Sequence, residues 1–217
     1  ITRVYALPPR YGSVAKAYIV QDSQIDSTDT GANSDSRIMN PLALNLYVLG
    51  YNAAKKLSPI NRAVKENIQT YLTQFRMVTD AVNIKDAFII NIAVKFNIIT
   101  KTGYNGEEVV LRAIQRVRDF FDIDKWQIGQ PIVLADLAYQ ISLVDGVSAV
   151  SPPEENNPKG LPVLIQNKFL GSAGYSGNMY DIQSATKEGV VYPSLDPSCF
   201  ELKFPATDIE GRVVGSS

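Results

Sequence analysis

The chain has 217 residues and is 45% hydrophobic and 20% charged, a composition typical of a soluble globular protein. Its 21 basic and 22 acidic residues nearly cancel, so no overall field favours nucleic acid or an anionic membrane as a partner. The complete absence of histidine excludes Ser-His-Asp and Cys-His catalysis, and the ordinary zinc sites, from residues of this chain alone.

The first 41 residues predict the end of a preceding β region followed by a polar loop. The opening letters ITRVYAL favour a strand, and because residue 1 is isoleucine we expect the chain to be a piece of a longer protein. A second short strand is expected over residues 14–20. Residues 21–37 are rich in Ser, Asp and Thr, which is typical of a mobile surface loop.

The same polar stretch has a second interpretation, a calcium-binding loop. With Asp26 as the first ligand, Thr28, Thr30 and Gly31 fall at loosely suitable positions. The twelfth position is then Arg37, where a bidentate glutamate is required. We therefore expect no calcium here and, over the whole chain, no metal site and no cofactor.

A strand and an amphipathic helix follow the loop. Residues 42–51 alternate as a strand does, with Leu42, Leu44, Leu46 and Val48 on one face. The helix is expected to take Ser58 as its cap and Pro59 as its first residue. Its apolar face comprises Ile60, Val64, Ile68, Tyr71 and Phe75.

Residues 87–100 predict the most regular strand of the chain. Every second residue is apolar, namely Phe88, Ile90, Ile92, Val94, Phe96 and Ile98. The opposite face carries Asn91, Lys95 and Asn97. We therefore expect one buried face and one partly wet face, as in an open sheet covered by helices on one side.

Two further helices and a strand are expected next. The first helix covers about 107–121, with Asn105 as its cap, two glutamates in its first turn, and an apolar stripe of Val110, Ile114, Val117 and Phe121. The second covers about 134–144 and faces inward through Leu134, Leu137, Ala138, Ile141 and Val144. Asp145-Gly146 ends it, and residues 147–153 favour another strand.

These elements give the order β-α-β-α-α-β over residues 42–153. We predict an α+β fold in which one small sheet is covered on one side by about three helices. Four prolines between 152 and 162 mark a boundary, after which residues 154–217 are expected to form a mostly β C-terminal region.

Three clusters invite a functional interpretation, and each has a simpler structural one. A glycine-rich stretch lacks the spacing of a phosphate-binding loop and favours a flexible connection. Three arginines in one helix lie among acidic residues, which favours a solvated face over a nucleic-acid stripe. Three aspartates near the end of that helix offer a carboxylate or cation site. The clusters are Gly171, Gly174 and Gly177; Arg112, Arg116 and Arg118; and Asp119, Asp122 and Asp124.

The only tryptophan and the only cysteine are also expected to be structural. Trp126 favours a packing role in the core or at an interface. Cys199 lies in YPSLDPSCFELKFP, where Phe200, Leu202 and Phe204 alternate with two charged residues. That alternation predicts a strand with one apolar and one charged face, and no histidine is available to activate the thiol.

Four passages in order resemble one known family: NPLALNLYVLGYN, NIQTYLTQFRMVTDAVNIKDAFIINIAVKFNI, FFDIDKWQIGQPIVLADLAYQISLVDGVSAV and GVVYPSLDPSCFELKFPATDIEGRVV. Together they cover roughly residues 40–217 and resemble the baseplate wedge proteins of T-even-like contractile-tailed bacteriophages, in the baseplate J-like family. The passage from Trp126 to Val147 is the most specific part.

The resemblance implies structural work in the virion, with assembly in the host cytoplasm. A protein of this kind would pair with a second copy of itself as a homodimer and with other baseplate wedge proteins, in a ring that rearranges when the tail contracts. The resemblance brings no catalytic residues, so we expect no enzyme. Two alternatives stay open: a carbohydrate-binding or adhesion module presenting Tyr175, Tyr180 and Tyr192, and a hydrolase that uses the aspartate cluster.

Overall fold

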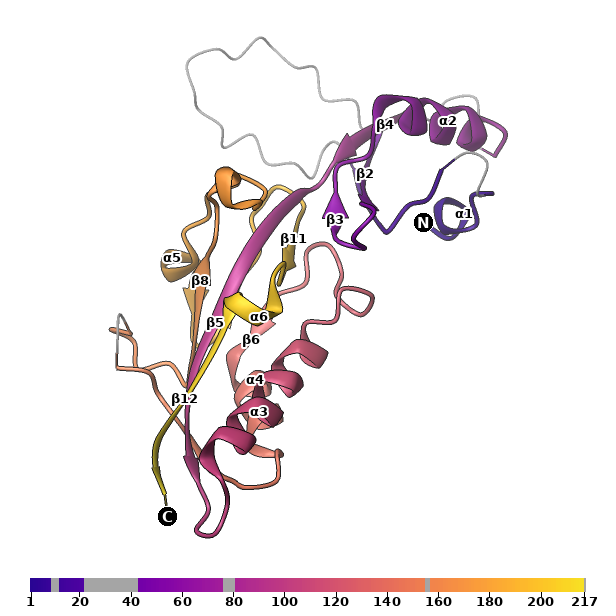
Figure 1. The fold of residues 1–217 in the computed structure, drawn as a ribbon. Coiled ribbons are helices and arrows are strands. Elements are labelled where there is room, and N and C mark those ends of the chain that lie inside the picture. Colours follow the sequence, from indigo (N-terminus) through magenta and orange to yellow (C-terminus); the bar gives the residue numbers. More distant parts are fainter. Residues whose placement is uncertain (9–11, 22–42, 76–80, 155–156, 217) are drawn as a thin grey trace. The chain divides into compact units, whose positions relative to one another are not determined.

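The computed structural model describes residues 1–8, 12–21, 43–75, 81–154 and 157–216, and it shows the predicted α+β fold (Figure 1). The polar loop and its calcium alternative lie outside the described residues, apart from Gln21. The chain forms two compact units. Unit 1 comprises residues 1–88 and 195–198, and unit 2 comprises residues 89–194 and 199–217. The division thus falls inside the 42–153 range that was expected to fold as one domain.

Unit 1 is built around a central strand, β2 (Ala43–Tyr51). β1 (Lys16–Gln21) pairs with it antiparallel on one side. β4 (Ala81–Asp86) runs parallel to it, and β3 (Leu57–Ser58) pairs with its end antiparallel. The opening strand predicted over ITRVYAL is wrong, because residues Thr2–Tyr5 form a short helix, α1.

The core of unit 1 lies where the helices meet one face of this sheet. Its buried members are Val4, Leu7, Ala17, Leu46, Val48, Ile60 and Ile68. The alternation expected for β2 is confirmed on that face, but the other face is not wet: Asn45, Tyr47 and Leu49 are buried as well. Both faces of β2 are therefore covered, which the alternation alone does not reveal.

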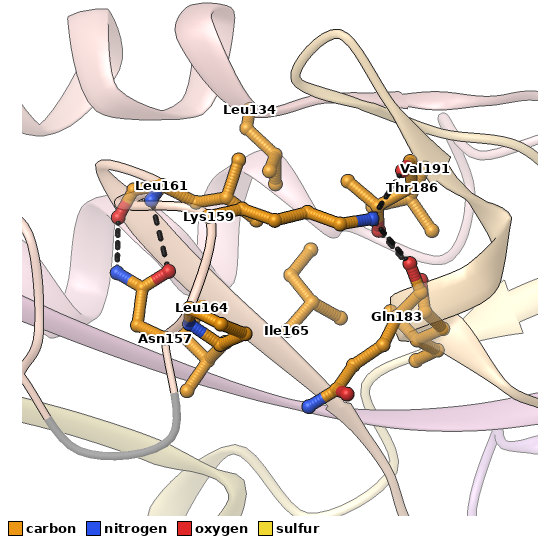
Figure 2. Close-up of a pocket in the computed structure, with 11 residues that line it drawn as sticks. Leu134, Asn157, Lys159, Leu161, Leu164, Ile165, Gln183, Thr186 and Val191 are labelled. Carbon is orange, nitrogen blue, oxygen red and sulfur yellow. Dashed lines mark hydrogen bonds between the residues drawn. The ribbon is translucent and has the colours of Figure 1, made fainter.

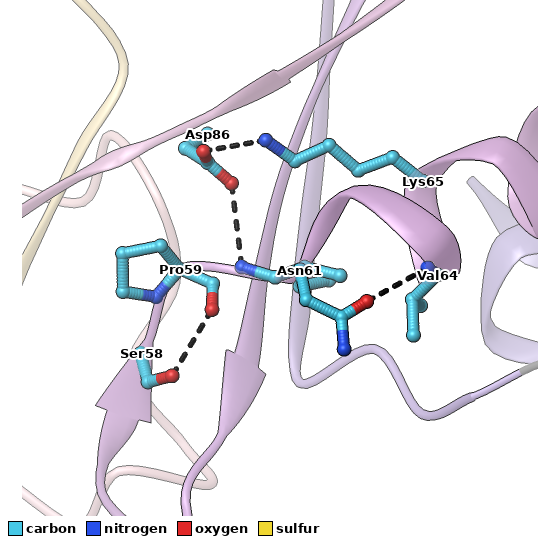
Figure 3. A network of polar contacts seen from close by, with 7 residues as sticks. Ser58, Pro59, Asn61, Val64, Lys65 and Asp86 are labelled. Carbon is cyan, nitrogen blue, oxygen red and sulfur yellow. Dashed lines mark hydrogen bonds and ion pairs between the residues drawn. The ribbon is translucent and has the colours of Figure 1, made fainter.

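Helix α2 (Arg62–Thr73) begins three residues later than the sequence predicts. Its cap is Asn61, whose Oδ1 accepts a hydrogen bond from Val64 N at 2.9 Å (Figure 3). Ser58 cannot cap it because Ser58 pairs with Gly50 in β3 and donates its hydroxyl to Pro59 O. Of the expected apolar face, Ile68 is fully buried, whereas Phe75 is exposed beyond the helix end.

The segment before α2 is held by one carboxylate. Asp86, at the end of β4, accepts from Ile60 N through Oδ1 at 3.3 Å. Its Oδ2 lies 2.5 Å from Lys65 Nζ, one turn into the helix (Figure 3). One side chain therefore fixes both the entry of α2 and its position on β4.

Unit 2 is organised by the predicted long strand, β5 (Phe88–Thr100), most of which belongs to this unit. Four other strands pair with it. β12 (Ile209–Ser216) is parallel to it, and β7 (Val147–Ser151) and β8 (Val163–Asn167) are antiparallel. β11 (Ser198–Glu201) also pairs with β5. The expected strands over 147–153 and around Cys199 are thus confirmed.

Two helices cover one face of this sheet (Figure 1). α3 (Gly106–Phe120) packs on β12, and α4 (Leu134–Ser142) packs on β7 and β8. Asn105 caps α3 as predicted, accepting from Glu107 N at 3.1 Å. The buried stripe of α3 matches the prediction only in part, at Val117 and, just past the helix end, at Phe121. It runs through Val109, Ala113 and Val117, while Val110 and Ile114 are only partly buried.

The second face of β5 was expected to be partly wet, and over part of its length that expectation is wrong. Asn91 and Ala93 are buried, and partial exposure begins farther along, at Lys95, Asn97 and Ile99. Glu201 was expected on the charged face of β11, yet it too is buried and bonded to Asn91. The C-terminal segments cover this part of the sheet, which a local alternation cannot predict.

Smaller elements complete unit 2. The short strands β6 (Ile132–Val133), β10 (Val190–Val191) and β9 (Thr186–Lys187) form a separate antiparallel sheet. The C-terminal region is less uniformly β than expected, because it also contains η3 (Gly171–Ala173), α5 (Ile182–Ala185) and α6 (Pro205–Asp208).

Candidate functional site

The aspartate cluster does not converge on one place. Asp119 is exposed and accepts from Gln115 Nε2 at 2.8 Å, one turn back along α3. Asp122 lies 3.5 Å from Lys125 Nζ and accepts from Asp124 N at 3.1 Å. Within the described part of the chain, no three acidic or cysteine side chains are grouped so as to hold a metal ion. These carboxylates belong to a helix end and a turn.

The three arginines of α3 have different surroundings. Arg116 Nη2 donates to Gln140 Oε1 at 2.7 Å, which joins α3 to α4. Arg112 lies farther from its acids, at 3.6 Å from Glu108 and 3.9 Å from Asp145. Arg118 is exposed in the last turn, where a cation suits the negative end of the helix. The arginines therefore do not form one stripe.

The glycine-rich stretch belongs to a loop that is fastened at both ends to β5. Lys168 N donates to Asn91 O at 2.8 Å, and Ser176 N donates to Asn91 Oδ1 at 2.7 Å. The Ser176 hydroxyl and Asn178 Nδ2 both donate to Ile89 O, at 2.8 and 2.9 Å. The loop between these anchors, which we call the fastened loop, is a connection, as expected. These hydrogen bonds hold both of its ends on β5.

The three tyrosines do not form one open aromatic platform. Tyr175 donates its hydroxyl to Asp208 Oδ1 at 2.6 Å and meets the Phe204 ring edge-on at 5.4 Å. Burial and this hydrogen bond raise the pKa of Tyr175 to about 12. Tyr180 donates to Tyr192 O at 2.7 Å, and burial also raises its pKa. Only Tyr192 presents an exposed ring.

Trp126 and Cys199 have the structural roles that the sequence predicts. The Trp126 ring is 5% exposed and packs against Phe120 and Phe121, with ring centroids 5.7 and 5.3 Å away. Cys199 is buried in β11, and its Sγ lies 3.7 Å from Gln127 O. Burial within the strand limits access of reagents to this thiol.

A small pocket lies in unit 2 beside α5 (Figure 2). Lys159 extends across it, and its Nζ donates to Gln183 O and Thr186 O at 2.6 and 2.7 Å. Beneath the lysine stem the lining is mostly apolar, from Leu134, Leu161, Leu164, Ile165, Ile182 and Val191. The cavity volume of about 40 Å³ has room for a few water-sized groups and not for a substrate. The lysine closes an apolar gap, as long cationic side chains do.

The remaining candidates are exposed apolar side chains, which the sequence analysis did not single out. Large ones occur on α3 (Leu111), on α4 and just after it (Tyr139 and Leu143), in the fastened loop and just after it (Leu170 and Met179), and on β12 (Val213 and Val214). Their signal in the sequence is weak, since each is an apolar residue off the buried stripe of its element. Such residues in groups mark protein–protein contact surfaces.

The α3 and β12 residues belong to one seam of unit 2. A Cβ built on Gly106 would lie 3.2 Å from Val213, so the start of α3 touches that strand residue. A Cβ on Gly211 would lie 2.7 Å from Phe96 and 3.2 Å from Val110. Gly211 is thus required for helix and strand to approach closely. We call the exposed residues along this seam, Leu111, Val213 and Val214, the β12 rim.

No helix in the described ranges has both the length and the apolar character needed to cross a membrane. No protein-family model matches the chain, and no curated protein matches it. Among solved structures, a chain of the anti-feeding prophage baseplate, determined by cryo-electron microscopy with six-fold symmetry, has a similar fold. The TM-score is 0.54 at 10% sequence identity, and the match covers 92% of this chain. This chain spans about a third of that longer chain, 36% of its length.

Proposed function

We propose that this chain is part of a structural subunit of a phage tail baseplate. The observation that carries the proposal is the fold likeness, which extends over 92% of the chain and both of its compact units. A likeness of this extent includes parts of both units and is therefore more specific than a shared motif. The sequence resemblance to baseplate wedge proteins points in the same direction.

The finer role we infer is that of a wedge component, located in the virion tail and assembled in the host cytoplasm. It would contact a second copy of itself and other wedge proteins, in a ring that changes its contacts when the tail contracts. Binding to nucleic acid or membrane forms no part of this role. The exposed apolar residues on α3, α4 and β12 support the proposal, because groups of exposed apolar side chains mark surfaces that another protein covers.

We also propose that the chain is not an enzyme. The acids of its helix end diverge, its cysteine is buried, and the small pocket beside α5 is crossed by a lysine stem that leaves no room for a substrate. The large exposed apolar side chains instead include several on α3, α4 and β12, which are regular elements of the fold. This combination suits an assembly protein, whose chemistry consists of covering apolar surface and satisfying polar groups.

The test is reconstitution with the other baseplate proteins encoded with this chain. The tagged chain is co-expressed with each neighbour and with all of them together, and the products are separated by size and viewed by negative-stain electron microscopy. We expect the chain to elute in a complex of several proteins that closes into a symmetric ring. If it elutes alone in every mixture, the proposed function is wrong. Light scattering of the chain by itself then tests the homodimer separately.

A further inference from the structure

One edge of the unit 2 sheet is unpaired. Among the described residues, β12 has β5 as its only strand partner, and the order β11-β5-β12 ends on it. Residues Ile209 to Val213 keep an unbroken parallel register with Val94 to Ile98, and an irregularity follows. The outer backbone groups of that unbroken stretch are therefore available to another strand. The strand carries no lysine or proline, the residues that most often block such an edge.

Helix α3 lies over this edge and extends beyond it. α4 lies over β7 and β8, on the other side of β5, while α3 lies over β12. Arg116, which bonds to α4, marks the inner flank of α3, and Val110, which touches the strand at Gly211, marks the opposite flank. Ile114 lies next to Val110, four residues before it, and next to Leu111, three residues before it, so Leu111 lies farther out from the strand than Val110 does.

This outer flank of α3 has no sheet beneath it. Leu111 is 66% exposed, Ile114 is partly exposed, and Val213 on the strand is 41% exposed. One more strand added to β12 would place the apolar side chains of its upper face against these residues. The added strand would then pack under α3 as β12 already does.

The opposite face of the edge is charged. Gly211 and Val213 face α3, so Glu210 and Arg212 point to the other side. Glu210 is paired with Lys95 at 3.1 Å. Arg212 is exposed and has no ion-pair partner within the described ranges. An added strand would therefore meet an unpaired positive charge on its lower face.

We propose that the β12 rim binds an extended segment of another protein, apolar on one face and acidic on the other, by strand addition. Main-chain hydrogen bonds to the open edge would supply affinity. Leu111, Ile114 and Val213 would take the apolar face, and Arg212 the acidic one. The inference rests on the proposed function, because a subunit of an assembly has partners to bind. The experiment below measures the edge itself and not incorporation into a baseplate, so the two proposals can fail separately.

The probes are two short synthetic peptides, one alternating valine with glutamate and one alternating valine with lysine. Each is titrated into the isotope-labelled full chain, and backbone amides are followed by NMR. We expect the glutamate peptide to shift the β12 amides and slow their hydrogen exchange. Its affinity should exceed that of the lysine peptide by about threefold or more at low salt, from one favourable instead of one unfavourable cross-strand charge pair.

Two variants and a control make the test specific. Leu111→Asp should weaken binding of the glutamate peptide severalfold, while Arg212→Glu should reverse the preference between the two peptides. Leu143→Asp is the control, since Leu143 is similarly exposed, at 54%, but follows α4. It should bind like the wild type. The dispersion of the amide spectrum shows whether each variant remains folded.

Three results would overturn the proposal. In the first, neither peptide perturbs β12. In the second, Leu143→Asp weakens binding as much as Leu111→Asp does. In the third, the β12 amides become protected without peptide as the chain is concentrated, which would make a second copy the occupant of this edge.

Discussion

Asn91 and Glu201 meet inside unit 2, 110 positions apart in the sequence, with Asn91 Nδ2 donating to Glu201 Oε2 at 2.8 Å. Their exposed fractions are 0% and 2%. The same amide group accepts from Ser176 N through Oδ1 at 2.7 Å. One buried side chain on β5 therefore joins the fastened loop to β11. An acidic residue in such a position needs its donors, because burial of an unpaired polar group is costly.

We expect Asn91→Ala to destabilise the protein by about 2–4 kcal/mol, since the buried Glu201 carboxylate loses a hydrogen-bond donor and the Ser176 N–H loses its acceptor. Asn97→Ala is the matched control, on the same strand and face but only partly buried, and should change stability by less than about 0.5 kcal/mol. Urea unfolding followed by fluorescence of Trp126 measures both. Equal effects of the two substitutions would show that the network contributes little.

The cap of α2 gives a second prediction. Asn61→Ala should cost about 1 kcal/mol, because the Val64 N–H loses its acceptor at the first turn. Ser58→Ala should cost less than about 0.5 kcal/mol, although the sequence pattern favours Ser58 as the cap. Thermal unfolding followed by circular dichroism distinguishes them. A larger loss from Ser58→Ala would mean that the helix begins where the pattern suggests.

Substitutions at two glycines with similar backbone angles distinguish the cost of backbone strain from the cost of steric crowding. Gly103 and Gly146 have φ of +87° and +92°, where a side chain is disfavoured. A Cβ on Gly103 would meet nothing within 4 Å, whereas one on Gly146 would lie 2.6 Å from Val109 and 2.7 Å from Tyr104. Gly103→Ala should therefore cost about 1 kcal/mol and Gly146→Ala about 1–3 kcal/mol more. Chemical denaturation of both variants measures the difference, and equal losses would contradict the close contact.

The Tyr175 phenol gives a prediction about alkaline pH. Its pKa is raised from 10.0 to about 12 in the folded protein, so the unfolded chain loses this proton first. Its contribution to stability is therefore complete below pH 10 and is lost as the pH rises toward 12. Between these values the wild type should lose stability more steeply than Tyr175→Phe. Denaturant midpoints across that range test this, and parallel curves for the two proteins would contradict it.

Local patterns predicted most elements but misplaced boundaries and faces where distant segments intervene. The β5 strand and the Asn105 cap follow from alternation and from one cap residue, and both are confirmed. Ser58 looked like a cap because Pro59 follows it. The pairing of Ser58 with Gly50 decides otherwise, and that pairing is invisible in the local sequence.

The candidate surfaces were harder to predict than the fold. In the sequence, Leu111 is one more apolar residue of an amphipathic helix. Its exposure follows from the fold, in which no strand lies beyond β12 among the described residues. Glu201 reads as a solvent-facing acid, and its burial depends on Asn91, far away in the chain. Both outcomes depend on the order of strands across the sheet, which a single sequence does not encode locally.

The parallel pairing of β12 with β5 has a consequence for biosynthesis. Thr100 and Gly215 lie side by side although 115 positions separate them, so the central strand of unit 2 acquires this neighbour only after nearly the whole segment has left the ribosome. Until then, one flank of β5 is open to wrong partners. Pairings this distant form slowly, so this flank of β5 in a nascent copy is exposed to aggregation until β12 has been synthesised.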